Sequence, residues 1–254
     1  MTGKKLEKPL VVLIHGLRGS HHGLEAVAKN LAVDFEVLTP DLPGSGERAE
    51  LQNKELAGYV EWLHEYCSRL GRKPFVVGHS MGSILVSHFV EKYPEDVERK
   101  MVLLAPILRT KRGAWSGKAL YCAMRVALFP FSPKAKHKIL ASRKVSYVVS
   151  HYLTYDKSKQ KEIDELHYKY GGRFASAESL LADAKISMMQ TVVVPEEKDV
   201  LLVMGAHDKL TKLELGQILE EEAGVECQKM KGVGHLLNYE KPGEVAATIR
   251  DFLL

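Results

Sequence analysis

Cysteine is scarce in this chain, and the few cysteines are scattered. Cys67, Cys122 and Cys227 lie far apart, with no CxxC motif and no cluster of histidines at metal-ligand spacing. Disulfide frameworks and structural zinc sites both need their ligating residues at short, regular spacings. We therefore expect no disulfide framework, no metal and a reducing compartment.

Long apolar runs are also missing. The early run Leu10–Ile14 ends after five residues at His-Gly, which is too short for a signal-peptide core. No later uncharged stretch reaches the roughly 18 residues of a membrane-spanning helix. We expect a soluble, unexported protein of the cytoplasm.

The excess of charge of one sign is small for the whole chain. The 36 Lys and Arg residues face 32 Asp and Glu, a net charge of +4, which gives no argument for nucleic acid as a partner. The distribution is uneven, because residues 107–190 carry 16 basic against 6 acidic residues, a net of +10, and the other 170 residues carry 20 against 26, a net of −6. A near-neutral total therefore hides a basic segment within an acidic remainder.

Short apolar segments alternate with segments of helical periodicity in the first 106 residues and again after residue 191. The expected strands are Leu10–Ile14, 35–38, 74–77, 100–105, 199–204 and 225–230, and the expected helices are 22–32, 53–70, 81–93, 211–223 and 241–253. Such alternation predicts the α/β class, with a mostly parallel sheet covered by helices on both faces.

The middle of the chain lacks this alternation. Helical segments are expected over residues 115–129, 142–154, 160–169 and 176–189, interrupted by Pro130, Pro133 and the Gly171-Gly172 pair. The segment is too long for a loop. We predict a core of residues 1–106 and 191–254 with an all-helical cap, residues 107–190, inserted into it.

A glycine-flanked serine lies between an expected strand and an expected helix. Residues 78–82 are Gly-His-Ser-Met-Gly, the G-x-S-x-G pattern that raises a serine hydroxyl at the carboxyl edge of a sheet. Asp208 and His235 follow later strands, and the order Ser80, Asp208, His235 is the one expected for this motif. We predict that Ser80 is a nucleophile, His235 its general base and Asp208 the group that orients His235.

Taken together, these motifs resemble the α/β-hydrolase superfamily, in particular its cap-bearing serine esterases and monoacylglycerol lipases. The resembling segments are His15-Gly16, residues 41–46, residues 78–82, residues 205–208 and Gly234-His235. The resemblance implies an oxyanion hole formed by the backbone N–H groups of Leu17 and Met81. It also implies that the inserted cap lies where capped members carry a lid.

The loop Asp41-Leu-Pro-Gly-Ser-Gly46 has the composition of a nucleotide-binding loop but not its pattern. It lacks both the lysine of GxxxxGK[ST] and the spacing of GxGxxG, so turn formation explains it better. We expect no cofactor.

The first helix of the cap has two interpretations. Lys111, Lys118 and Arg125 recur every seven residues beside the apolar residues of the segment 114–131. Either the apolar face lines an acyl pocket while the basic stripe faces water, or the basic cap contacts an anionic membrane or attracts acidic lipid substrates. Contact with a membrane would make the protein peripheral to an inner membrane face.

The expected function is hydrolysis of carboxylic esters, of the medium-chain acyl or monoacylglycerol type, through an acyl-enzyme on Ser80. Two alternatives stay open. One is carbon-carbon bond hydrolysis of a diketone-like acid, and the other is a ligand receptor that keeps the triad but turns over slowly. A small-molecule ester is the expected partner.

Overall fold

The computed structural model describes residues 7–109 and 111–254, without the side chains of residues 111–114. In this part of the chain, six parallel strands form one sheet in the order β2-β1-β3-β4-β5-β6. The strands are β1 (Leu10–Ile14), β2 (Glu36–Leu38), β3 (Phe75–His79), β4 (Lys100–Leu104), β5 (Asp199–Gly205) and β6 (Glu226–Met230). The predicted α/β class with a parallel sheet is confirmed.

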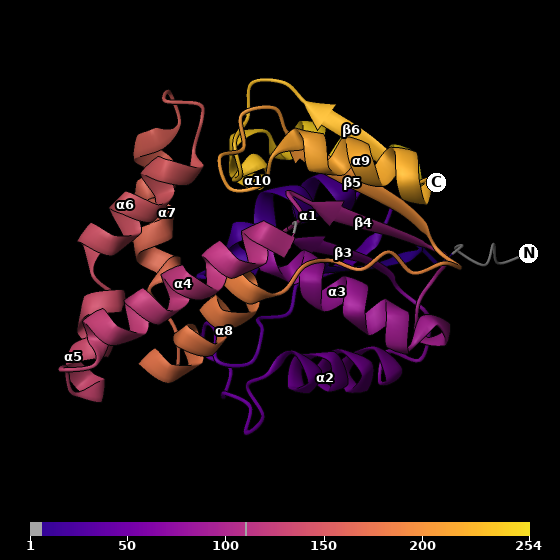
Figure 1. Cartoon of the computed structure of the whole chain (residues 1–254). Helices are drawn as coiled ribbons and strands as arrows, with labels where there is room; N and C mark the ends of the chain where they lie inside the picture. Colours follow the sequence, from indigo (N-terminus) through magenta and orange to yellow (C-terminus); the bar gives the residue numbers. More distant parts are fainter. Residues whose placement is uncertain (1–6, 110) are drawn as a thin grey trace, which may run out of the picture.

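Helices cover both faces of the sheet (Figure 1). Helices α1 (Glu25–Leu31) and α11 (Pro242–Leu253) pack on one face, and α2 (Leu56–Ser68), α3 (Met81–Lys92) and α9 (Leu213–Ala223) pack on the other. Within β1, Val11 and Leu13 face the first layer, whereas Val12 and Ile14 face the second. Because both faces are covered, β1 is buried along its whole length, which explains its uniformly apolar sequence.

Strand register brings several loops to the same edge of the sheet. Ile14 pairs with Gly78, His79 with Leu104, and Leu104 in turn with Val203. Since all strands are parallel, the residues that follow β1, β3 and β5 meet at the carboxyl edge. This is the edge at which parallel sheets bind their ligands.

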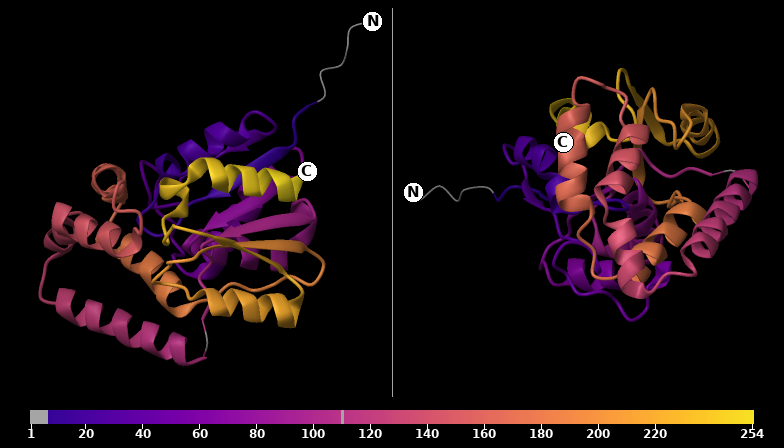
Figure 2. Two further views of the ribbon diagram at one scale, coloured as in Figure 1. Left: turned by 90° about the horizontal axis from the view of Figure 1, so that it is seen from above. Right: turned by 90° about the vertical axis from the view of Figure 1, so that its left-hand side faces the viewer.

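Five helices lie between β4 and β5 and gather beside the carboxyl edge of the sheet (Figures 1 and 2). They are α4 (Lys111–Leu128), α5 (Pro133–Leu140), α6 (Arg143–Leu153), α7 (Gln160–Gly171) and α8 (Ala177–Met189). We call this group of helices the cap. Its division from the core at residues 107 and 190 stays a prediction about folding units.

Two short helices were not expected from the sequence. Pro133 was expected to interrupt helical structure, but it begins α5, with the side chain of Ser132 accepting the N–H of Ala135. Proline suits this first position because its missing N–H would have no partner there. The segment expected to form one helix over residues 241–253 is preceded by a separate short helix, α10 (Leu237–Glu240); short turns η1 (His21–Gly23) and η2 (Pro94–Asp96) complete the elements.

Candidate active site

Ser80 occupies a strained position between β3 and α3. Its φ of 55° and ψ of −119° lie in a region that residues other than glycine rarely adopt. The turn is tight, because a Cβ added to Gly78 would lie 2.4 Å from the carbonyl oxygen of Gly82, and one added to Gly82 would lie 2.4 Å from that of Ile14. The two glycines of the motif are therefore required by close backbone packing.

Ser80, His235 and Asp208 form a continuous chain of hydrogen bonds. The Ser80 Oγ lies 2.8 Å from the His235 Nε2, and the His235 Nδ1 lies 2.8 Å from an Asp208 carboxylate oxygen. An ionised carboxylate only accepts, so Nδ1 carries a proton and Nε2 is left to accept the proton of the hydroxyl. The histidine and aspartate side chains are 2% and 1% exposed, which excludes water from the chain.

The environment of Asp208 keeps its carboxylate ionised. Burial acts to raise the pKa of Asp208, but His235 and the backbone N–H groups of Leu210 and Thr211 outweigh burial and hold the pKa below its ordinary value. An ionised carboxylate at this position orients the imidazole and stabilises an imidazolium.

The two backbone donors expected of an oxyanion hole flank the serine. A Cβ on Gly16 would lie 2.8 Å from Ser80 Cβ and 3.3 Å from its Oγ, so the loop after β1 runs directly against the serine. Leu17 follows in that loop, and Met81 follows Ser80 at the start of α3. Within the described residues, neither N–H donates a hydrogen bond, which leaves both available to a ligand.

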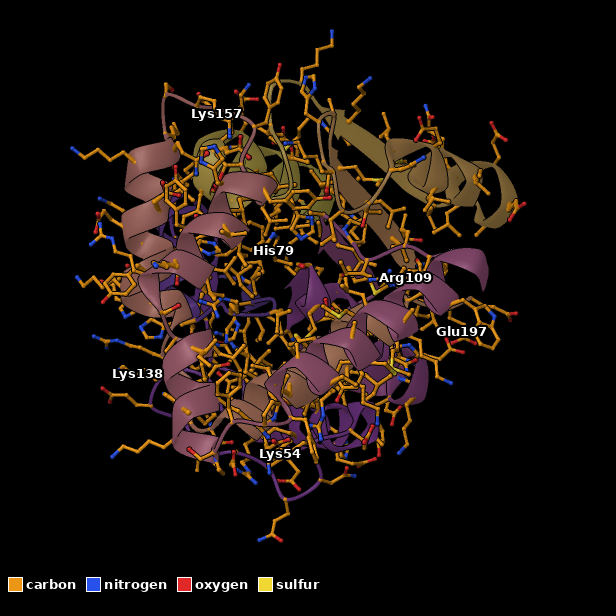
Figure 3. The ribbon with its side chains drawn as sticks, turned by 60° about the vertical axis from the view of Figure 1, so that its left-hand side comes forward. Lys54, His79, Arg109, Lys138, Lys157 and Glu197 are labelled. Atoms are coloured by element: carbon orange, nitrogen blue, oxygen red, sulfur yellow. The ribbon has the colours of Figure 1, made fainter. Side chains whose placement is uncertain are left out.

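Two further histidines near the serine support the site rather than react. His79 lies in the interior between the cap and the sheet (Figure 3) and donates its Nε2–H to the carbonyl of His235, 3.1 Å away. Burial, reinforced by His235, lowers the pKa of His79 to about 3, so this ring stays neutral. Burial also lowers the pKa of His15, whose ring joins the Gly16 carbonyl to the Leu42 N–H.

Arg18 connects the loop after β1 to the cap, a role that the sequence did not reveal. Its guanidinium donates to the carbonyl of Leu140 at 2.7 Å and to the Ser146 Oγ at 2.9 Å. Burial lowers the pKa of Arg18 to about 10. The one local signal is its position, two residues after the Gly16 that contacts Ser80.

A small cavity of about 40 Å³ lies beside this arginine and is also lined by His79 and His235. Four buried atoms of its lining lack a hydrogen-bond partner among the described residues: Arg18 Nε, Ser20 Oγ, His167 Nδ1 and Asn238 Oδ1. No carboxylate lines it. By size, such a cavity holds a few water molecules or one small polar group.

A second polar contact between core and cap involves Tyr59 of α2 and Asp183 of α8. The tyrosine hydroxyl donates to the carboxylate at 2.5 Å, and both side chains are buried. Burial raises the pKa of Asp183 to about 7, although the hydrogen bond from Tyr59 acts in the opposite direction.

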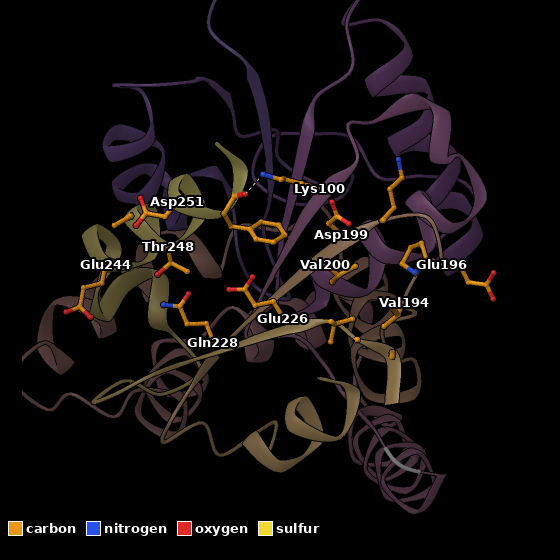
Figure 4. A pocket seen from close by; sticks show the side chains of 17 residues that line it. Lys100, Val194, Glu196, Asp199, Val200, Glu226, Gln228, Glu244, Thr248 and Asp251 are labelled. Carbon is orange, nitrogen blue, oxygen red and sulfur yellow. Dashed lines mark hydrogen bonds between the residues drawn. The ribbon is translucent and has the colours of Figure 1, made fainter. Parts of the chain in front are cut away.

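A larger depression, of about 980 Å³, lies at the other edge of the sheet (Figure 4). Its lining includes Lys100, Asp199 and Glu226, which begin β4, β5 and β6. It therefore opens at the amino edge, away from Ser80, and takes no part in the site.

The expectation that histidines form no cluster at metal-ligand spacing needs correction. His21, His22 and Glu25 bring ligating atoms within 4.8 Å of one another, because a helical turn gathers side chains three and four positions apart. These side chains already bind each other and Asp41, with His22 Nδ1 2.6 Å from Glu25 and His21 Nδ1 2.9 Å from Asp41.

Comparison with known proteins identifies the class of protein to which this chain belongs. The model of the "Alpha/beta hydrolase family" matches residues 11–248, so the chain belongs to that family and the resemblance inferred from the sequence is confirmed. The protein is a hydrolase with esterase and lipase relatives.

Among these relatives is the monoacylglycerol lipase ABHD6 of Rattus norvegicus, which is 23% identical over 99% of this chain and 77% of its own length. An esterase from Thermogutta terrifontis, solved with malate bound, superposes with a TM-score of 0.73 at 18% identity, over 97% of this chain and 90% of the other. A 2-hydroxy-6-oxo-6-phenylhexa-2,4-dienoate hydrolase from Rhodococcus sp. strain RHA1 gives a TM-score of 0.71 at 19% identity over the same shares. At this identity, the two solved structures support the fold.

Within the described residues, no helix combines the length and the hydrophobicity needed to cross a bilayer.

Proposed function

We propose that this protein hydrolyses carboxylic esters through an acyl-enzyme on Ser80. The observation that carries the proposal is the chain of hydrogen bonds from Ser80 through His235 to Asp208, with 2.8 Å at each link. A serine alone is a weak nucleophile, and a base within hydrogen-bond reach activates it.

Each group has a defined part in the reaction. Ser80 Oγ attacks the acyl carbonyl carbon while His235 Nε2 takes the hydroxyl proton, and the negative oxygen accepts the N–H groups of Leu17 and Met81. When the intermediate collapses, the alcohol leaves with the proton held by His235. Water then attacks the acyl-enzyme with His235 again acting as base, which releases the acid and restores Ser80.

The substrate class in this proposal is a medium-chain acyl or monoacylglycerol-type ester. The printed activity of the rat relative, a monoacylglycerol lipase, supports it. Apolar cap residues near the serine also support it, because Leu17 packs against a cluster that contains Leu128 and Phe174. A cytoplasmic location remains part of the proposal.

The direct test is covalent labelling followed by turnover. A fluorophosphonate probe should label the wild type and Ser68→Ala, which alters an exposed serine at the end of α2, but not Ser80→Ala. A panel of p-nitrophenyl esters should then show turnover that rises from short to medium chains. Absence of labelling would reject the mechanism, and labelling without turnover of any ester would favour a slow receptor.

A second candidate function is carbon-carbon bond hydrolysis of a diketone-like acid, and the small cavity beside Arg18 favours it. Among the described residues, no carboxylate pairs with the buried Arg18, and a buried cation without such a partner is costly. A substrate carboxylate in the cavity would supply that partner, and the Rhodococcus relative bears the name of an acid substrate.

One comparison tests whether the cavity binds the carboxylate of an acid substrate. The wild type and Arg18→Gln are compared on esters that carry a free carboxylate and on neutral esters of the same shape. If the cavity binds a carboxylate, the variant should show a raised KM for the acids alone, and Arg18→Lys should restore part of the difference. An equal effect on both substrates would leave Arg18 with a purely structural role.

A further inference from the structure

Helix α4 has two apolar faces, and among the described residues one of them is packed whereas the other is exposed. Gly117, Tyr121, Met124 and Leu128 follow a helical spacing and are buried or half-buried. This face lies against α8, so closely that a Cβ on Gly117 would lie 1.9 Å from the carbonyl oxygen of Met188. One side of α4 is therefore fixed to the cap.

The opposite face of α4 is exposed from Trp115 onward. It consists of Trp115, Ala119, Cys122, Val126 and Phe129, again at helical spacing. Trp115 is 73% exposed, Val126 73% and Phe129 82%. We call these five residues the outer face of α4, and Figure 2 shows this helix along the outside of the cap in both views.

The segment of the chain that carries the outer face is basic in sequence. Residues 107–155 contain ten Lys and Arg and no Asp or Glu. Lys118 lies on α4 with its ammonium 5.6 Å from the centre of the Trp115 ring, whereas Arg125 is paired with Glu178 at 2.8 Å. Among the described residues, no carboxylate pairs with Lys118, Lys134 or Lys138.

We propose that the outer face of α4 binds the surface of an anionic lipid bilayer. Exposed aromatic and aliphatic residues flanked by lysines are the composition of a helix that lies in a membrane interface. An anionic surface supplies the negative charge that this part of the chain lacks. The outer face lies opposite the side of α4 that packs on α8, so binding leaves the cap contacts intact.

Charge also argues against a second copy of this chain as the binding partner of the outer face. A symmetric dimer places the same patch on both sides of its interface. Two outer faces would bring Lys118 and its basic neighbours against their own copies, with no acidic residue between 107 and 155 to compensate. An anionic bilayer has no such conflict.

The test is flotation of the full chain with lipid vesicles. One set contains phosphatidylcholine alone, and the other an equimolar mixture of phosphatidylcholine and phosphatidylglycerol. The wild type should float with the anionic set and should do so less at physiological than at low salt. Absence of flotation with the anionic set at both salt concentrations would overturn the proposal.

A matched pair of variants locates the contact. Val126→Glu and Val33→Glu make the same substitution at valines that are 73% and 72% exposed, and Val33 lies just after α1, outside the cap. Val126→Glu should lower the floated fraction at least about fivefold, whereas Val33→Glu should leave it near the wild-type value. Equal losses in both variants would contradict the assignment to α4.

A charge variant and two controls complete the test. Lys118→Glu should weaken binding to the anionic vesicles about tenfold or more, because it exchanges an attraction for a repulsion. Thermal unfolding and hydrolysis of a water-soluble ester should stay unchanged in every variant, which separates membrane binding from catalysis. If the wild type does not float but self-associates, and Val126→Glu abolishes this self-association, the outer face binds a second copy of the chain and the membrane proposal is rejected.

Discussion

The carboxyl edge of the sheet and the outer face of α4 differ in how their side chains are partnered. At the sheet edge, Asp208 and His235 are almost completely buried and each polar atom has a defined partner. On α4, large apolar side chains such as Val126 lie mostly in water, 73% exposed. The first region is complete within the chain, whereas the second lacks an apolar partner.

The cap therefore has two apolar surfaces, one packed against the core and one exposed. Its inner side contributes Leu128 and Phe174 to a cluster against Leu17, and its outer side carries Trp115 and Val126. Each of the two interpretations of this helix can therefore be tested on a different face. Perturbing each region separately should change different properties of the protein.

The largest effect should come from the hydrogen-bonded chain itself. Ser80→Ala removes the nucleophile and should lower kcat by about 10⁴-fold to 10⁶-fold, and Asp208→Asn should lower it by about 10⁴-fold because the imidazole is no longer held in the required tautomer. Steady-state kinetics on a medium-chain p-nitrophenyl ester measures both. Activity within tenfold of wild type in either variant would contradict the assigned roles, provided that circular dichroism shows the native fold.

A smaller effect should follow from a single methyl group beside the serine. Gly16→Ala places a Cβ 3.0 Å from the carbonyl oxygen of His79 and 2.8 Å from Ser80 Cβ, so the loop that carries the Leu17 N–H must shift. Loss of one oxyanion donor costs about 10²-fold to 10³-fold in kcat. Gly243→Ala is the control, because nothing lies within 4 Å of its new Cβ, and equal kinetics of the two variants would argue against Leu17 as a donor.

The smallest effect concerns stability and arises where core and cap meet. The pKa of Asp183 is about 7 in the folded chain against an ordinary 3.8, so between these values the folded chain holds a proton that the unfolded chain releases. The free energy of unfolding should therefore fall by roughly 1.4 kcal/mol for each pH unit over this window. Urea unfolding between pH 4 and pH 7 measures that slope.

Two variants sharpen the assignment of this slope. Asp183→Asn keeps an acceptor for Tyr59 but cannot ionise, so the contribution of this residue should vanish and the variant should gain stability relative to wild type as the pH rises. Tyr59→Phe removes the hydrogen bond that lowers the pKa of Asp183, so the free energy of unfolding should continue to fall up to a higher pH. An unchanged slope in Asp183→Asn would show that another group causes it.

The sequence predicted the parallel sheet and the residues that meet at its edge because both follow from local patterns. A buried strand of parallel sheet is uniformly apolar, and the strained turn at Ser80 requires glycines two positions away on either side. Since parallel strands share one carboxyl edge, the order of strands sufficed to bring Asp208 and His235 near Ser80.

Other features could not be predicted because they depend on distant contacts. The hydrogen bond from Arg18 to Leu140 joins residues 122 positions apart, and no local pattern marks it. The orientation of α4 was undecided because both of its faces are apolar, so periodicity cannot show which one packs on α8. The contact with α8, closest at Gly117, fixes that choice.

Arg18 links the position of the cap to the geometry of the loop next to Ser80. Its side chain holds the carboxyl end of α5 and the first half of α6, while its backbone is joined directly to Leu17. Outward movement of these helices must either break two buried hydrogen bonds or pull on the peptide unit beside the proposed oxyanion donor. The position of these cap helices and the geometry beside Ser80 are therefore coupled through a single residue.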